Sequence, residues 1–219
     1  MNLQAFRRKP LMGIVRGIQS DDLEPVVEHA IEAGLETLEI TMNTAGAPEL
    51  IGKAQEISGG RVTLGAGTVL ERAALEAALD AGATFVVLPT LVEEIVSICV
   101  ERGVPVFPGA LTPTEVYAAW RAGATMVKVF PAKVFGAEYF KQLKDPLGEL
   151  SLLACGGVSA ETLEAYARAG ADAFAFGASV FRADWIASRD YVRLTDAIRE
   201  LIAVYNRVSC ARVEAVGGR

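Results

Sequence analysis

The sequence is poor in residues that bind metals or form disulfide frameworks. Its 219 residues include a single histidine, His29, and three cysteines, Cys99, Cys155 and Cys210, which lie far apart. One histidine cannot supply a multi-histidine zinc site, so we expect no metal centre. An odd number of widely spaced cysteines is typical of a reducing compartment rather than of a disulfide scaffold, which predicts a cytoplasmic location.

The sequence also lacks a run of basic residues and a long hydrophobic segment. It has 21 basic and 27 acidic side chains, a net charge of −6, and no cluster of Lys or Arg. This charge balance disfavours a nucleic-acid partner. The apolar stretch near the N-terminus is interrupted by Gly13 and Arg16, so it is too short for a signal peptide or a transmembrane helix. We therefore expect no membrane partner.

What the sequence does contain is a repeated alternation of helix-like and strand-like segments. Five times, a helix-like stretch ends in Ala-Gly or Arg-Gly and an apolar run follows within one or two residues. Glycine is a common residue at the end of a helix because it adopts left-handed conformations freely. Three further apolar runs lack this glycine signature. The eight runs are centred roughly 23 residues apart, from Ile14 to Phe174, which is the length of one strand, one helix and two short loops.

This eightfold alternation predicts an α/β fold, a closed parallel (β/α)8 barrel (TIM barrel) of near-minimal size. We expect residues 1–219 to form one domain, with residues 209–219 as a flexible tail. The alternative is an open doubly wound sheet, but no Gly-x-Gly-x-x-Gly fingerprint follows the first strand. In a barrel the active site forms at the carboxyl ends of the strands, which narrows the search for functional residues.

Lys128 is the clearest candidate for a reactive group. It lies between Val127 and Val129 in an apolar run, with no carboxylate nearby in the sequence. Burial disfavours the charged form of a lysine, and the neutral amine can attack a carbonyl to form a Schiff base. The alternative is a lysine that points outward or extends to the rim of the barrel.

Glu39 is the matching candidate for an acid and base. Strand alternation places Thr37, Glu39 and Thr41 on one face and Leu38 and Ile40 on the other. A carboxylate that faces the barrel interior near a neutral lysine can transfer protons directly or through water. The alternative is a structural ion pair, with Arg16 as one possible partner.

Two glycine-containing segments near the end of the chain predict a phosphate site. Gly156 and Gly157 lead into a helix that Ser159 can cap, and Gly177 and Ser179 follow the eighth strand. Barrels often bind phosphate with the loops after strands seven and eight, through backbone N–H groups and a helix N-terminus. The alternative is that these glycines only form tight turns.

Three other residues carry weaker signals. Thr68, at the end of GAGTVL, offers its hydroxyl to a carboxylate or carbonyl or caps the following helix. Cys155 occupies a plausible site position without a nearby histidine, so we interpret it as a buried thiol rather than a nucleophile. His29 falls in a helix and is expected on its surface.

Several segments together resemble the 2-keto-3-deoxy-6-phosphogluconate (KDPG) and 4-hydroxy-2-oxoglutarate (KHG) aldolase family. The segments are LEITMNT, GAGTVL, VVLPT, VFPGALTPTE, MVKVFPA, ACGGV and FGAS, in this order, between about Arg8 and Trp185. The family comprises Schiff-base aldolases of class I on a small (β/α)8 barrel, usually trimeric. The resemblance implies a carbon–carbon lyase of carbohydrate metabolism, of the Entner–Doudoroff type, that needs no cofactor.

The resemblance also assigns roles to individual residues. Lys128 would be the Schiff-base lysine and Glu39 the general acid and base. Thr68 would contact the pyruvate part of the substrate, Pro89 and Phe130 would wall the pocket, and Cys155 would stand beside the substrate. Gly156, Gly157, Gly177 and Ser179 would hold the phosphate.

The sequence departs from the gluconate-type pattern at two places. Asn43 stands where an arginine is common, and Ala154-Cys155 stands where Pro-Thr precedes the two glycines. Asn43 and the segments VRGI and FGAEYFKQLK are more similar to the branch that cleaves the galactonate epimer, in which Arg16 would bind the carboxylate. The resemblance therefore implies cleavage of 2-keto-3-deoxy-6-phosphogluconate, and possible cleavage of 4-hydroxy-2-oxoglutarate, with the phosphogalactonate epimer as the alternative.

Two further interpretations stay open at this point. One is a phosphate-ligand binding barrel without activity, since a fold alone does not fix a function. The other is a different small phosphate-binding barrel enzyme, such as a thiamine-phosphate synthase or an isomerase. A degenerate binder has no need of a Lys128–Glu39 pair, and the other enzymes need no barrel lysine between valines.

Overall fold

The computed structural model describes the backbone of residues 1–217 and the side chains of residues 1–210, and it is an α/β barrel. All its strand pairs are parallel, and the order of the strands is β5-β4-β3-β2-β1-β9-β8-β7-β6. The strands are β1 Leu11–Val15, β2 Thr37–Thr41, β3 Thr63–Gly67, β4 Val86–Val87, β5 Val106–Phe107, β6 Gly109–Ala110, β7 Val127–Val129, β8 Leu152–Cys155 and β9 Ala173–Phe176. The (β/α)8 prediction is confirmed.

Nine strands occupy eight barrel positions because Pro108 divides the fifth one. β5 and β6 stand at opposite ends of the strand order, yet only Pro108 separates them in the chain. β5, which precedes Pro108, pairs with β4, and β6, which follows Pro108, pairs with β7. Proline has no N–H to donate to a ladder, so the strand changes partners there. The chain itself closes the barrel at this point.

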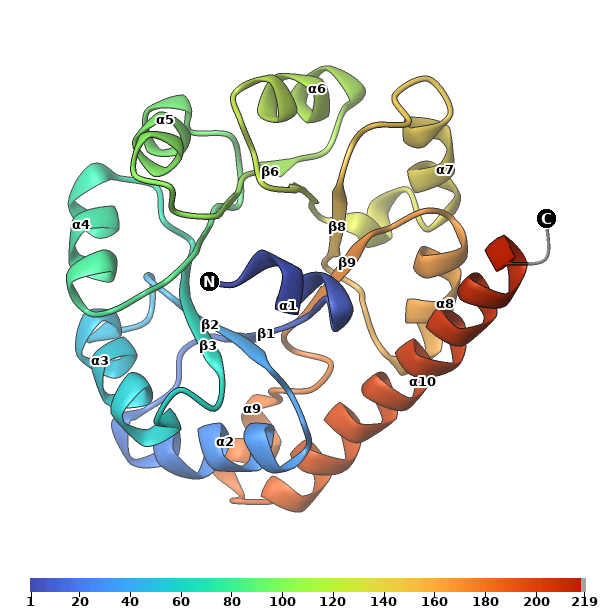
Figure 1. The fold of residues 1–219 in the computed structure, drawn as a ribbon. Helices are drawn as coiled ribbons and strands as arrows, with labels where there is room; N and C mark the ends of the chain where they lie inside the picture. The colour runs from blue at the N-terminus through green and yellow to red at the C-terminus, as the bar shows by residue number, and fades with distance from the viewer. Residues whose placement is uncertain (218–219) are drawn as a thin grey trace.

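Helices surround the strands, as Figure 1 shows. They are α1 Leu3–Arg8, α2 Ser20–Glu32, α3 Ala47–Ser58, α4 Arg72–Asp80, α5 Glu93–Glu101, α6 Pro113–Arg121, the 3-10 helix η1 Ala132–Val134, α7 Glu138–Lys144, α8 Ala160–Arg168, α9 Ala183–Ala187 and α10 Tyr191–Gly217. No helix of the described residues is long and apolar enough to cross a membrane.

The strands separate two apolar cores, as period-two alternation requires. Leu38 and Ile40 of β2 and Val127 and Val129 of β7 belong to the larger core between the strands and the helices. A second cluster fills the inside of the barrel and includes Phe85, Phe107, Met126, Leu153 and Cys155.

Helix α1 closes the amino-terminal end of the barrel, which the eightfold pattern does not predict. It crosses the centre of the view in Figure 1, and its side chain Phe6 is 3% exposed. The Phe6 ring meets the Phe107 ring edge to face, with centroids 5.9 Å apart. Since this end is plugged, the free end of the barrel is the one where the strands terminate.

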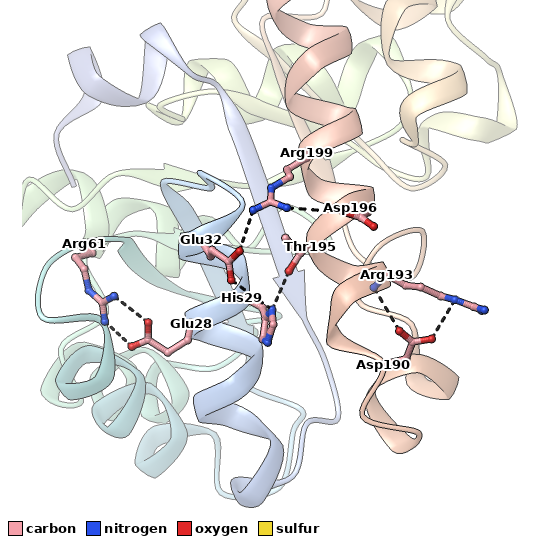
Figure 2. A network of polar contacts seen from close by, with 9 residues as sticks. All are labelled: Glu28, His29, Glu32, Arg61, Asp190, Arg193, Thr195, Asp196 and Arg199. Carbon is pink, nitrogen blue, oxygen red and sulfur yellow. Dashed lines mark hydrogen bonds and ion pairs between the residues drawn. The ribbon is translucent and has the colours of Figure 1, made fainter.

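Helix α10 is fastened to α2 by polar contacts, which Figure 2 shows from close by. His29 Nδ1 lies 2.9 Å from Thr195 Oγ1, and its ring stacks on Tyr191 at 5.4 Å. Arg199 donates to Glu32 Oε1 at 2.9 Å. His29 was expected on a helix surface, but its side chain is 30% exposed because α10 covers it.

The segment predicted to be a flexible tail begins inside α10. This helix continues to Gly217, whereas residues 218 and 219 lie outside the described residues. The flexibility of residues 209–219 stays a prediction.

Candidate active site

A cavity of about 800 Å³ opens at the carboxyl ends of β1, β7, β8 and β9. Its lining includes eight of the residues that the sequence analysis singled out: Arg16, Lys128, Phe130, Cys155, Gly156, Gly157, Gly177 and Ser179. They come from four neighbouring barrel positions, because the strand order brings β1 next to β9, β9 next to β8 and β8 next to β7. The cavity lies where a parallel barrel gathers its functional side chains.

Lys128 enters this cavity from the inner face of β7. Val127 and Val129 face the outer core, so alternation turns the lysine inward. The residue is only 5% exposed, and its Nζ lies 5.2 Å from the centroid of the Phe130 ring. A lysine with this burial is rare unless it is paired or used. The outward-pointing alternative is therefore wrong.

Glu39 is buried on the inner face of β2, at 1% exposure, near enough for the charge of Lys128 to act on its carboxyl group, but it is not among the residues that line the cavity. Burial raises the pKa of its carboxyl group, and the charges of Lys128 and Arg16 only partly oppose that effect. Its Oε2 atom has no hydrogen-bond partner among the described residues. A buried, unpartnered oxygen with a raised pKa is suited to taking up and returning a proton.

A glycine of the neighbouring strand makes room for the Glu39 carboxyl group. A Cβ atom at Gly67 would lie 2.5 Å from Glu39 Oε1 and 2.8 Å from its Cδ. Position 67 is paired with Thr41 in the register of β2 and β3, two residues beyond Glu39. The GAGTVL segment therefore contributes to the site because Gly67 has no side chain and so leaves room for the Glu39 carboxyl group.

Cys155 is buried on the inner face of β8 at 3% exposure and also lines the cavity. Burial raises the pKa of its thiol, which Lys128 opposes through its charge and a hydrogen bond. A buried thiol with a raised pKa is a poor nucleophile, in agreement with the expectation for this residue.

Arg16 is exposed at the rim, directly after β1. The next residue anchors its loop, because the Gly17 N–H donates to Thr44 Oγ1 at 2.9 Å. Thr44 Oγ1 in turn lies 3.1 Å from Thr41 Oγ1 at the end of β2. These contacts hold the backbone that carries Arg16. The sequence pattern does not predict them.

Three predicted site residues stand at the rim but outside the lining of the cavity. Asn43 is exposed in the turn after β2, Thr68 follows β3, and Pro89 follows β4. Thr68 adopts a left-handed conformation with φ of 56°, and the residue that caps α4 is Glu71. The alternative reading of Thr68 as a helix cap is therefore wrong.

The loops after β8 and β9 form the far end of the cavity. Gly156 and Gly157 have φ values of +85° and +98°, which favour glycine. Ser159 caps helix α8 in a capping box with Thr162. Ser179 Oγ donates to the Val158 carbonyl at 2.8 Å and ties the two loops together. Backbone N–H groups at the start of α8 are available for an anion here.

Lys133 is a lining residue that sequence reasoning missed. Nothing in KVFPAK distinguishes this residue from a surface lysine. Lys133 lies in η1, and its backbone N–H donates to the Gly156 carbonyl at 2.9 Å, which holds it next to the loop after β8. No group of three or more His, Cys, Asp or Glu within the described part of the chain is arranged to hold a metal.

Comparisons with known proteins show which family this chain resembles. A family model described as KDPG and KHG aldolase matches residues 3–197. The chain is 34% identical over 182 residues to 2-dehydro-3-deoxy-6-phosphogalactonate aldolase of Escherichia coli strain K12, covering 83% of this chain and 89% of that protein. It is 32% identical over 161 residues to 2-dehydro-3-deoxy-phosphogluconate aldolase of Pseudomonas aeruginosa, covering 73% of each. The solved structure described as "Native KDPGal structure" matches with a TM-score of 0.85 at 31% identity, over 91% of this chain and 96% of that chain.

Proposed function

Because this chain belongs to the KDPG and KHG aldolase family and is a carbon–carbon lyase, we propose that it cleaves 2-keto-3-deoxy-6-phospho sugar acids into pyruvate and glyceraldehyde 3-phosphate. The observation that carries this proposal is the buried pair formed by Lys128 and Glu39 inside the barrel. A buried amine and a buried carboxyl group with a raised pKa are the two groups that a Schiff-base aldolase needs.

The first half of the reaction belongs to Lys128. Its neutral amine attacks the C2 ketone of the substrate, and loss of water gives a protonated imine. The imine withdraws electrons from the neighbouring C3 carbon and so accepts the electron pair of the C3–C4 bond. The Phe130 ring, which lies 5.2 Å from Lys128 Nζ, helps to keep bulk water away from this linkage. Neither a metal nor an organic cofactor is required by this chemistry.

The second half belongs to Glu39. Its carboxylate takes the proton from the C4 hydroxyl group, the C3–C4 bond breaks, and glyceraldehyde 3-phosphate leaves. The remaining enamine is reprotonated at C3, and hydrolysis of the imine releases pyruvate and the free lysine. The free Oε2 atom gives this carboxyl group an acceptor position that no protein group occupies among the described residues.

The two ends of the substrate carry negative charge, and the site offers groups for both. Arg16 and the Thr68 hydroxyl would bind the carboxylate, with Pro89 and Cys155 bordering it. Gly156, Gly157, Gly177 and Ser179 would surround the phosphate. The cavity of about 800 Å³ is within the usual range for a ligand of this size.

Trapping of the imine tests the proposal directly. Pyruvate and borohydride should give a stable reduced adduct on Lys128, located by peptide mass spectrometry. Lys128→Ala should lose at least about 10³-fold in kcat, whereas Lys141→Ala, on the outer surface, should retain wild-type activity. An adduct on another lysine, or none under conditions that label a control aldolase, would leave a binding barrel as the better description.

The gluconate and galactonate substrates differ only in configuration at C4, and we propose activity on both. A site that reads this hydroxyl loosely accepts either epimer. Asn43 stands at the rim where it can influence the choice, since an arginine there would add a charged group for the carboxylate. Asn43→Arg should shift the ratio of kcat/KM values toward the gluconate substrate severalfold, about 1 kcal/mol. An unchanged ratio with both activities intact would exclude Asn43 as the selector.

We also propose that the protein assembles as a homotrimer and works in the cytoplasm. Val134 and Phe135 are 56% and 55% exposed next to one another, and Phe135 packs on Tyr139. Phe140, which follows Tyr139 in the chain, is fully buried in the core and does not belong to this exposed cluster. The three cysteines are free thiols, as in a reducing compartment.

A further inference from the structure

The charge of the cavity differs from that of the whole chain. The lining contains three basic side chains, Arg16, Lys128 and Lys133, and no acidic one, since Glu39 near the reacting end is not a lining residue. The chain as a whole has a net charge of −6. A basic cavity in an acidic protein attracts an anionic ligand, because low-dielectric walls concentrate the field of the charges inside.

The three basic residues stand in different parts of the cavity. The charges of Lys128 and Arg16 both act on the carboxyl group of Glu39, so both residues belong to the reacting end. Lys133 follows β7, and β8 stands between β7 and β9 in the strand order. Its N–H contacts the loop after β8. The proposed chemistry uses the first two cations and leaves Lys133 without a role.

The backbone and stem of Lys133 are fixed against the glycine pair. Its N–H donates to the Gly156 carbonyl at 2.9 Å. A Cβ atom at Gly157 would lie 2.6 Å from Lys133 Cβ and 3.4 Å from its Cγ and Cδ atoms. The stem therefore lies over Gly157, and the ammonium group beyond it can reach a ligand on the Gly156–Gly157 loop.

The ammonium group of Lys133 forms no ion pair with a carboxylate of the described residues. Lys9, Lys141 and Lys144 pair with Glu36, Glu138 and Asp172. Lys53 donates to Ser20. Two acidic side chains that follow these loops in the chain have other partners, since Glu161 accepts from Ser159 and Asp184 pairs with Arg182. Lys133 is thus a free charge at the anion end of the cavity.

We propose that Lys133 binds the distal phosphate dianion and makes the enzyme select phosphorylated over unphosphorylated aldehydes. This inference rests on the proposed function and adds a residue to its site. Backbone N–H groups supply hydrogen bonds to a phosphate but no net charge. A charge-assisted bond from an ammonium group favours the dianion over a neutral hydroxyl in the same position.

The condensation direction offers a matched pair of substrates. Pyruvate is combined with glyceraldehyde 3-phosphate or with glyceraldehyde, which differ only in the phosphate group. In Lys133→Ala the ratio of the two kcat/KM values should fall about five- to tenfold, mainly through KM for the phosphorylated aldehyde. Lys133→Arg should keep most of the ratio, and Lys141→Ala should keep all of it. A ratio in Lys133→Ala within twofold of wild type would overturn the proposal.

A binding measurement separates this inference from the proposed reaction. Inorganic phosphate is titrated against the wild-type protein and Lys133→Ala, and the chemical shifts of the Gly156 and Gly157 amides are followed. The inference requires weaker phosphate binding in the variant, at the same amides, whether or not the protein condenses these aldehydes. Equal affinities would refute it, even for an active aldolase.

Discussion

Glu39 combines complete burial with an oxygen atom that has no partner. Removing a carboxylate from water disfavours its charged form, and the nearby cations do not fully compensate. The folded protein therefore holds the Glu39 proton more tightly than the unfolded chain does. As the pH rises from the ordinary pKa of 4.5 through the raised pKa of the folded state, this residue lowers the free energy of unfolding.

Glu39→Gln tests two properties of this carboxyl group separately: its proposed role in catalysis and its effect on the stability of the fold. The amide cannot accept the C4 proton, so kcat should fall by about 10²–10⁴-fold. The variant should be more stable than the wild type at pH 7, and the difference should disappear as the pH falls to about 4. Thermal unfolding across this pH range checks the sign. Glu56→Gln, on the exposed face of α3, should change neither property, and a Glu39→Gln protein with normal kcat would exclude Glu39 as the acid and base.

The sequence predicts the inward residues well and the loop residues poorly. Alternation in LETLEI and TMVKVF is sufficient to place Glu39 and Lys128 inside the barrel, because strand geometry leaves two faces only. Lys133 lies in the short 3-10 helix η1 and Asn43 lies in a turn, and neither segment is long enough for a period to relate sequence position to side-chain direction. Their places depend on backbone conformations that only the folded barrel defines.

At the scale of elements, β2 and β3 fit closely together in the site. Gly67 lies under the Glu39 carboxyl group, and its backbone does not need a positive φ. Gly67→Ala is therefore a steric probe of Glu39 rather than a change in backbone freedom. The added methyl group must displace the carboxyl group or separate the strands.

Gly67→Ala should lower kcat about 10- to 100-fold and destabilise the fold by about 1–3 kcal/mol. Steady-state kinetics and denaturant unfolding measure the two effects. Gly52→Ala is the matched control, since its nearest neighbour would be the Ala81 carbonyl at 4.0 Å. In the middle of α3 this control should stabilise the protein by about 0.5–1 kcal/mol. Unaltered kcat in Gly67→Ala would show that the position of Glu39 tolerates displacement.

Element boundaries show where periodicity is insufficient. The repeat of helix, glycine and apolar run predicts eight barrel positions, and the fold has them. It gives no sign of α1, which is a short plug held by Phe6, or of the change of partners at Pro108. Both features depend on contacts between distant parts of the chain, which local patterns do not encode.

At the scale of the whole molecule, the exposed apolar pair Val134–Phe135 is the strongest sign of association. Adjacent large apolar side chains in water are unfavourable unless a partner covers them. Sedimentation at micromolar concentration should show a trimer, and Phe135→Asp should dissociate it. Val192→Asp replaces an apolar residue of α10 that is 65% exposed but stands next to Arg193, and it should leave the trimer intact. A wild-type monomer would refute the assembly.

The interruption of the fifth strand at Pro108 also bears on how the barrel moves. Five register pairs join β2 to β3, whereas one joins β3 to β4 and two join β4 to β5. Amide hydrogen exchange will accordingly be fast in the wall from β4 to β6 and slow in β2 and β3. The strands expected to exchange fast carry Pro89 at the rim, and the strands expected to exchange slowly carry Glu39. Glu39, the proposed acid and base, is thus expected on the wall that exchanges slowly, and the wall that exchanges fast borders the mouth of the barrel.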